Sequence, residues 1–364
     1  MNYLYWLGAI IPLILTGFFI KKVNDIRGGL IATPSLLMLW GFYLGFTYYS
    51  KDIEYHGGWI TSVTWEESWT EQVTTYSTDD KGNITTSTTY VYHPDHYYLK
   101  DSNGYLVGIY SKQYAELAQL FGGSTKIDDG HGGQSSFGDG RTFRADYPNT
   151  PMAFTPCFTS HRYENRIITS SSIFNFEKVD LKLTPVYDYP LIFDNYKQNS
   201  LVGLDDPDME NVLTLFNSRN GAEHKIRLFV VVFNDQPSSI GRAQQAYWQG
   251  GNKNEVVVCV GLKAGVIDWV YPFGWGNEKL MVDLREEISE YSALDEMTIN
   301  AIIKLVSDSY TKIDWHQFDY LPVYFPWWVY PIGWSLSILT WFITYGVLTD
   351  FDDIRRILRR VKNS

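Results

Sequence analysis

The chain has 364 residues, a formal net charge of −11 and a mean hydropathy of −0.19. That hydropathy excludes a protein made mostly of transmembrane helices, and the length accommodates one large polar domain or two smaller ones. Residues 1–50 and 350–364 each carry a net +2, which leaves −15 for residues 51–349. An acidic region of that size would repel a phosphate backbone, so we expect no nucleic-acid partner.

Three long uncharged stretches frame the polar region. Residues 1–20, 28–50 and 320–349 contain no Asp, Glu, Lys or Arg. A helix that crosses a bilayer needs about 20 apolar residues, and each stretch reaches that length. The sequence therefore predicts three spans: a helical hairpin in residues 1–50 with its loop at 21–28, and one helix in residues 321–349. A signal peptide is a poorer explanation of the first stretch, because its positive charges follow the apolar run.

The basic residues beside these stretches predict the orientation, since short loops rich in Lys and Arg stay in the cytoplasm. The N-terminus and residues 51–320 would then be extracytoplasmic, and the tail at 350–364 cytoplasmic. Aromatic residues at the entry to the third stretch fit a belt at the lipid headgroups, with membrane lipid as a partner. The basic residues are Lys21, Lys22, Arg27, Arg355, Arg356, Arg359 and Arg360, and the aromatic residues are Trp327, Trp328, Tyr330 and Trp334.

Residues 51–223 are β-rich, with a long hairpin predicted at 59–100. Thr, Val, Tyr and Trp, which favour strands, fill the arm from Trp59 to Thr78 and the return from Thr85 to Tyr92. The intervening Asp-Asp-Lys-Gly-Asn sequence is typical of a turn. Both arms are polar on both faces. We therefore expect a protruding ribbon, or an edge paired with another subunit, rather than the centre of a buried sheet.

A short amphipathic helix is predicted after this hairpin. Apolar residues recur at helical spacing from Lys112 to Phe121, Ser111 would be the N-cap, and Gly122 and Gly123 would end the helix. Residues 122–142 are Gly-rich and without periodicity, which indicates a loop.

Two loops carry side chains of the types that bind metals. The pair of imidazoles in the first would suit zinc, and the carboxylates of the second would suit calcium. Neither matches an established ligand spacing, and solvated polar turns explain both better than a metal site does. We predict no cofactor, with a divalent cation as the alternative. The candidate ligands are His93 and His96, and Asp205, Asp206 and Asp208.

The two cysteines, Cys157 and Cys259, leave two alternatives open. On an oxidising side of the membrane they could form one disulfide. Cys259, however, lies within an apolar run, where a buried free thiol is equally expected.

Residues 224–320 predict a layered α/β unit. Near-continuous apolar runs at 225–233 and 255–262 are typical of strands covered on both faces. A helix that ends near Trp248 separates them, and a third strand follows near Val266. Apolar residues at helical spacing then predict two helices, one around Leu284 and one around Ile302. The order β-α-β-β-α-α implies helices packed on a mixed sheet.

That order resembles the TPM domain, which is found in thylakoid-lumen photosystem-repair proteins and in bacterial membrane-anchored relatives. The matching elements are Leu228–Phe233, the helix to Trp248, the turn at 251–254 into Glu255–Val260, and the strand and helices after it. The resemblance implies an exported α/β domain followed by a membrane helix, and some members are associated with acid phosphatase activity. The family's glycine-rich segment is matched only by residues 273–276, and its acidic site is not recognisable, so no catalytic residue is carried over.

Three functions remain open from the sequence. The first is a non-enzymatic membrane protein whose outer domain assembles with other protein subunits, as a homo-oligomer or within a membrane, envelope or virion complex. The second is a membrane-anchored phosphatase or other hydrolase of the TPM type, with Asp205, Asp206, Asp208 and Asp268 as metal ligands. The third is an oligomeric channel or secretion subunit, in which Gly41 and Gly45 let helices pack closely. Three or more carboxylates gathered in one cleft would favour the enzyme.

Overall fold

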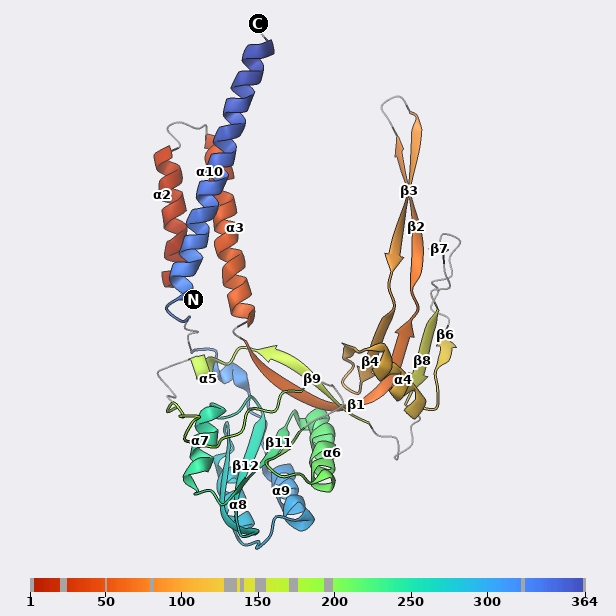
Figure 1. The fold of residues 1–364 in the computed structure, drawn as a ribbon, viewed down its shortest axis with the longest axis vertical. Coiled ribbons are helices and arrows are strands. Elements are labelled where there is room, and N and C mark those ends of the chain that lie inside the picture. The colour runs from red at the N-terminus through yellow and green to blue at the C-terminus, as the bar shows by residue number, and fades with distance from the viewer. Residues whose placement is uncertain are drawn as a thin grey trace. The chain divides into compact units, whose positions relative to one another are not determined.

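The computed structural model describes residues 3–19, 25–49, 51–78, 82–127, 136–137, 141–147, 155–169, 176–192, 199–321 and 325–362. The chain forms two compact units. Residues 1–52, 162–175 and 314–364 make the first, which we call the helical unit. Residues 53–161 and 176–313 make the second, which we call the α+β unit. Figure 1 shows the elements of both.

The helical unit has a small aromatic core. Tyr5, Leu39, Phe325 and Val329 are buried together in it. Hydrogen bonds link its helices: the Tyr5 hydroxyl donates to the Leu39 carbonyl at 2.7 Å, and the Trp341 indole donates to Thr16 Oγ1 at 2.8 Å. The elements are α1 (Tyr3–Trp6), η1 (Leu7–Ala9), α2 (Ile10–Phe19), α3 (Asp25–Tyr49), α5 (Arg166–Thr169), η4 (Trp315–Phe318) and α10 (Val329–Lys362).

The helices of the described residues include none that combines the length and the apolar character needed to cross a membrane. The prediction of an integral membrane protein with three spans, an extracytoplasmic N-terminus and a cytoplasmic tail is therefore wrong. It rested on missing charges, whereas a span requires apolar side chains. The first stretch is divided among α1, η1 and α2, and α3 contains Pro34. The uncharged stretches also hold many Gly, Ser, Thr and Tyr residues.

The residues that supported the membrane prediction have other surroundings. Trp334 donates from its indole to the Tyr5 carbonyl at 3.0 Å and lies against Gly8. Tyr330 packs against the aromatic core, whereas Trp327 is 80% exposed. Gly41 and Gly45 have open space beside them, so they mediate no close helix packing among the described residues. The seven basic residues lie outside the described residues or have side chains that are not described.

A six-stranded sheet begins the α+β unit. Its order is β5-β4-β1-β8-β6, and β9 also pairs with β1. One side of the sheet carries α4, whose Leu117 packs with Ile60, Val63 and Leu99. β1 is therefore a central strand. We had expected the long hairpin to lie outside any buried sheet centre, and this is wrong for residues 59–66, which belong to β1. The elements are β1 (Asp52–Glu66), β4 (His96–Asp101), β5 (Leu106–Gly108), α4 (Ser111–Leu120), β6 (Thr125–Ile127), β8 (Thr142–Asp146) and β9 (Pro156–Tyr163).

Residues 69–78 and 84–93 of the predicted hairpin form a separate ribbon. β2 (Trp69–Thr78) and β3 (Ile84–His93) pair antiparallel, and the short β7 (Ser136–Phe137) pairs with the start of β2. The α4 helix begins at Ser111 rather than after it, because Tyr110 is the capping residue and its amide donates to the Gln113 side chain at 2.9 Å.

The α/β subdomain is a four-stranded sheet of order β10-β11-β12-β13. The first three strands are parallel and β13 is antiparallel. Alternate residues of Leu228–Phe233 in β11 and of Val256–Val260 in β12 point to opposite faces, and all of them are apolar and buried, so both faces are covered. The elements are β10 (Leu201–Val202), α6 (Pro207–His224), β11 (Arg227–Asn234), α7 (Ser239–Tyr247), β12 (Glu255–Lys263), β13 (Val266–Gly274), α8 (Glu278–Ser289) and α9 (Glu296–Ser309).

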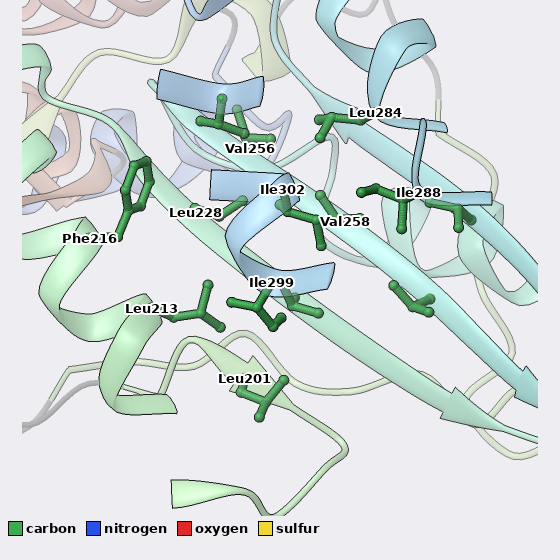
Figure 2. Close-up of a cluster of buried hydrophobic side chains, with 14 of the residues drawn as sticks. Leu201, Leu213, Phe216, Leu228, Val256, Val258, Leu284, Ile288, Ile299 and Ile302 are labelled. Atoms are coloured by element: carbon green, nitrogen blue, oxygen red, sulfur yellow. The ribbon is translucent and has the colours of Figure 1, made fainter. Parts of the chain in front are cut away.

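Two helix layers enclose this sheet. One face carries α6, α8 and α9, where Leu213, Leu284 and Ile302 pack on Leu228 and Val258 (Figure 2). The other face carries α7, through Ile240 and Trp248. Because β10, β11 and β12 succeed one another in the same direction while α6 and α7 cover opposite faces, their two crossovers have opposite hands. One of them thus departs from the usual right-handed connection.

The elements predicted for residues 224–320 are present in the predicted order. The subdomain also extends before residue 224, because Leu201 of β10 and Met209 and Leu213 of α6 belong to the same core.

Candidate interaction surface and buried polar site

The β2–β3 ribbon is a regular two-stranded structure. Ten cross-strand pairs run from Trp69–His93 to Thr78–Ile84 without a register shift. β7 pairs only with Thr70 and Glu71, so from Gln72 onward both outer edges of the ribbon have no strand neighbour among the described residues. Such edges present backbone N–H and C=O groups to any strand that approaches.

The two faces of the ribbon differ. Side chains alternate along a strand, so directly paired residues with even numbers share one face. That face carries all four of the ribbon's most exposed large side chains, which are Tyr76, Ile84, Tyr90 and Tyr92. We call it the tyrosine face. Tyrosines are common anchors in protein interfaces. The opposite face is mostly Thr and Ser in its outer part.

The ribbon lacks the features that protect sheet edges. Between Gln72 and Thr78, and between Ile84 and Tyr92, there is no charged residue and no proline. Nine of the ten residues of β3 are exposed. Natural proteins normally protect an edge with charges, proline or a bulge, and this edge has none of the three.

His93 and His96 lie at the junction between the ribbon and the six-stranded sheet. His93 stacks on Trp69 with ring centroids 4.3 Å apart and approaches Glu71 at 3.2 Å. His96 opposes Glu66 across β4 and β1. Asp95 accepts from the Trp65 indole at 3.1 Å and from the Ser68 amide at 2.9 Å. These contacts connect the β2–β3 pair of the ribbon to the β1–β4 pair of the six-stranded sheet.

The acidic loop has a structural role at the start of α6. Asp206 is the N-cap, and its carboxylate accepts from the amides of Asp208 and Met209 at 3.1 and 3.0 Å. Asp205 precedes this cap, and Asp268 lies on β13. Within the described residues, no group of three His, Cys, Asp or Glu side chains could hold a metal ion.

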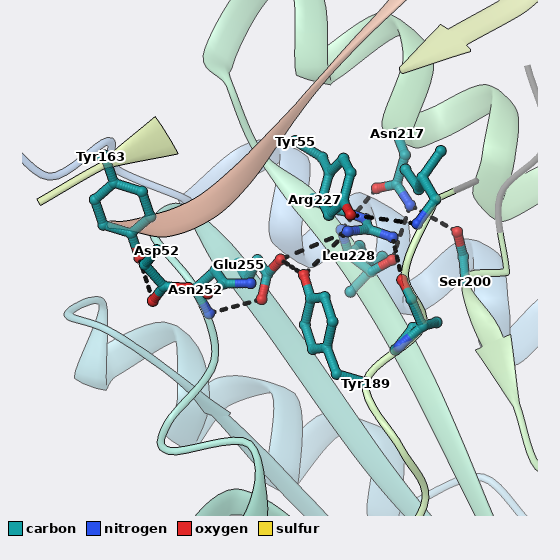
Figure 3. Close-up of polar contacts among 12 residues, drawn as sticks. Asp52, Tyr55, Tyr163, Tyr189, Ser200, Asn217, Arg227, Leu228, Asn252 and Glu255 are labelled. Atoms are coloured by element: carbon teal, nitrogen blue, oxygen red, sulfur yellow. Dashed lines mark hydrogen bonds and ion pairs between the residues drawn. The ribbon is translucent and has the colours of Figure 1, made fainter. Parts of the chain in front are cut away.

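A buried polar site lies at the amino-terminal ends of β11 and β12. Arg227 and Glu255 are directly paired across these strands, with 3.7 Å between Nη1 and Oε1, and their side chains are 3% and 2% exposed. The Tyr189 hydroxyl donates to Glu255 and accepts from Arg227 (Figure 3). The Tyr55 and Phe229 rings face the guanidinium at 4.6 and 4.2 Å. Burial, followed by the charge of Glu255, holds the pKa of Tyr189 well above its usual range.

Asn217 joins α6 to the same strand ends. Its amide nitrogen donates to the Leu228 carbonyl at 2.8 Å and to Ser200 Oγ at 3.0 Å, and its oxygen accepts from the Leu228 amide at 2.6 Å (Figure 3). The Asn217 side chain is fully buried, and its hydrogen bonds to Leu228 and Ser200 position α6 on the sheet.

A second set of polar residues surrounds the start of β1. His56 and His161, on the paired strands β1 and β9, stack with ring centroids 4.3 Å apart. Glu54 Oε1 lies 3.3 Å from both His56 Nε2 and Lys253 Nζ. Burial alone would raise the pKa of Glu54, but the hydrogen bond and charge of His56, and those of Lys253, lower it. The buried atoms Glu54 Oε2, His56 Nδ1 and Asn254 Nδ2 have no hydrogen-bond partner among the described residues.

The carboxyl ends of the parallel strands, where open α/β sheets usually bind ligands, are covered by an aromatic side chain. Trp269 stacks on Phe233 with centroids 5.9 Å apart, lies against Gly261, and donates from its indole to the Gln236 carbonyl at 2.8 Å. The buried pair Arg227 and Glu255 lies at the opposite end of these strands.

Cys157 and Cys259 are both free thiols, so the alternative of a disulfide between them is wrong. They belong to different cores: Cys157 packs beneath α4, and Cys259 packs on the α7 face of the α/β sheet.

Comparisons with protein-family models, curated proteins and solved structures found no match to this chain. The similarity to the TPM domain therefore stays a prediction. The sequence reasoning missed the Arg227–Glu255 pair, although a signal was present: two consecutive buried strands begin with residues of opposite charge. It also missed His56 and His161, which lie 105 positions apart and come together only through strand pairing.

Proposed function

We propose that this protein is a non-enzymatic assembly component that joins other protein subunits through the β2–β3 ribbon. The observation that carries the proposal is an uninterrupted, uncharged strand pair with exposed edges and a tyrosine face. Strand addition at such an edge supplies main-chain hydrogen bonds, and the tyrosines beside it supply contact area.

The partner that we propose is a second copy of this chain. The whole chain carries −11, so two copies repel each other over most of their surface, but the outer ribbon is free of charge. Antiparallel pairing of β3 with its own copy is a two-fold contact in which each surface meets itself. It places Thr and Ser of β3 opposite residues of the same kind, and such pairs stabilise sheets.

Two observations favour assembly over the hydrolase. The candidate ligands Asp205, Asp206 and Asp208 are engaged in, or adjacent to, a helix cap. The carboxyl end of the α/β sheet is occupied by Trp269. The channel alternative required membrane spans, and the helices of the described residues include none that could cross a membrane.

The test is the mass of the purified full-length chain in solution, measured by native mass spectrometry and by light scattering over a range of concentrations. We expect a discrete homo-oligomer. Replacing Tyr90 and Tyr92 by Ala should weaken it, since interface anchors contribute about 2 kcal/mol or more each, roughly 30-fold in affinity. Thr88→Lys should act in the same direction by placing a charge on the tyrosine face.

Matched controls are Thr85→Ala and Thr89→Ala, on the opposite face of the same strand, which should weaken the oligomer much less than the tyrosine variants, because a cross-strand Thr pair contributes at most about 1 kcal/mol. A wild-type chain that is monomeric at every concentration would refute self-assembly. An oligomer that survives both the tyrosine and the lysine variants would show that the ribbon is not the contact.

A further inference from the structure

The stacked His56–His161 pair lies where three parts of the α+β unit meet. His56 belongs to the first half of β1, and His161 lies on β9, which pairs with β1. The Tyr105 ring, from the turn after β4, covers His161 with centroids 4.5 Å apart. The pair is partly buried, since the His56 side chain is 13% exposed.

The same stretch of β1 is held on the α/β subdomain by contacts from several elements. Ser218 of α6 donates to the Gly58 carbonyl, and Lys253, before β12, reaches Glu54. Gly57 lies so close to α6 that a Cβ at this position would collide with the Asn217 carbonyl. Residues 54–58 are therefore the part of β1 that joins the six-stranded sheet to the α/β subdomain.

We propose that the His56–His161 pair is an acid-sensitive latch, which holds residues 54–58 of β1 on the α/β subdomain at neutral pH and loosens them when both imidazoles take up protons. Two neutral rings can stack at 4.3 Å, whereas two imidazolium ions at that separation repel each other. Histidine is the side chain whose charge ordinarily changes between about pH 5 and pH 8.

The surrounding charges make a second proton unfavourable. Glu54 Oε1 lies 3.3 Å from both His56 Nε2 and Lys253 Nζ, so one carboxylate serves both groups. With both histidines neutral, the carboxylates of Glu54 and Asp101 balance the ammonium groups of Lys225 and Lys253, so two added protons leave an excess of positive charge. The charged groups that act on the pair are Glu54 on β1, Asp101 at the end of β4, Lys225 between α6 and β11, Lys253 before β12, and, through Lys225, Lys312 after α9.

The direction of the pH effect follows from His161. Its burial, then the charges of His56 and Lys225, lower its pKa, and these outweigh the opposing effect of Glu54 and Asp101. Between the ordinary histidine pKa of about 6.5 and the lower folded value, the unfolded chain binds more protons than the folded chain. The free energy of unfolding therefore falls as the pH drops through that window.

Hydrogen exchange followed by mass spectrometry on the full-length chain tests the latch. Protection factors, which are corrected for the intrinsic pH dependence of exchange, are compared from about pH 7.5 down to about pH 5, the range in which histidine titrates. We expect protection of peptides spanning residues 53–58 and 217–221 to fall with acidification in the wild type. His56→Gln and His161→Gln should remove this pH dependence. His96→Gln, an exposed histidine on β4, should preserve it.

Two results would overturn the proposal: protection that does not change with pH in the wild type, or a His161→Gln variant that keeps the wild-type pH dependence. A proton NMR titration of the histidine rings in the wild-type chain gives a reading that does not depend on the folding of any variant. A His161 that titrates at or above the usual value of about 6.5 would contradict the latch.

Discussion

The buried Arg227–Glu255 pair makes a quantitative prediction. Glu255→Gln leaves a guanidinium that is almost fully buried without its counter-ion, and Arg227→Met leaves the carboxylate in the same position. Breaking a buried ion pair on one side costs about 3–5 kcal/mol, because the remaining charge stays in a medium of low polarity. Each single replacement should therefore lower the free energy of opening of β11 and β12 by about 3–5 kcal/mol.

The double replacement Arg227→Met with Glu255→Leu should be milder than either single one. Exchanging a whole buried pair for apolar side chains is often neutral or stabilising. Here the Tyr189 hydroxyl loses its bonds to Arg227 and Glu255, and lost hydrogen bonds of a buried polar group cost about 1–3 kcal/mol. The Nε of Arg227 has no hydrogen-bond partner among the described residues, so the native pair is itself incompletely satisfied. We therefore expect the double variant to lose about 1–3 kcal/mol relative to the wild type.

The assay is native-state hydrogen exchange of the β11 and β12 amides, because a chain with two compact units has no single unfolding free energy. Glu116→Gln breaks the exposed Lys112–Glu116 pair on α4 and is the control, for which little change is expected. If the double variant loses the sum of the two single losses, the residues do not interact energetically and the reasoning from burial is wrong.

Three further predictions concern other parts of the α+β unit. Gly57→Ala should lower the free energy of opening of α6, measured by native-state hydrogen exchange, by about 1–3 kcal/mol, because the new methyl group collides with α6, whereas Gly108→Ala, where the space is open, should be neutral or nearly so. Burial raises the pKa of Cys157 to about 12 and that of Cys259 still further, so a thiol reagent should modify both only on unfolding. The lowered pKa of Glu54 contributes stability above its ordinary value of 4.5 that is lost as the pH falls through the folded value, and Glu54→Gln should flatten the stability profile in that acid range.

The elements that sequence predicted best were those whose pattern is decided locally. The apolar runs of β11 and β12 are continuous, which predicts strands without a solvent-exposed face. In the structure, Leu228–Phe233 and Val256–Val260 are buried throughout. The Thr-rich arms of the ribbon were also predicted as strands, since Thr, Val and Tyr favour the extended conformation. In both cases, residue types along one segment suffice to determine its environment.

The elements that sequence missed depend on distant partners. β1 is central because Ile60 and Val63 pack beneath α4, which lies about fifty residues later in the chain. β10 has only two residues and becomes a strand by pairing with β11. The membrane prediction failed for another reason: it took the absence of charge as a measure of apolarity, although Gly, Ser, Thr and Tyr are uncharged without being strongly apolar.

The latch and the ribbon are parts of one continuous strand system. β1 contacts the α/β subdomain at Glu54 and ends at Glu66 beside the base of the ribbon, where the Trp65 indole donates to Asp95. Twelve residues of strand at about 3.3 Å each span roughly 40 Å. A change at residues 54–58 would reach the ribbon along β1 past Ile60 and Val63, which pack in the core beneath α4. If the histidine variants alter protection at residues 53–58 but leave the oligomer unchanged, the latch and the assembly surface are independent. If acidification weakens the oligomer in the wild type but not in His161→Gln, the strand transmits the change.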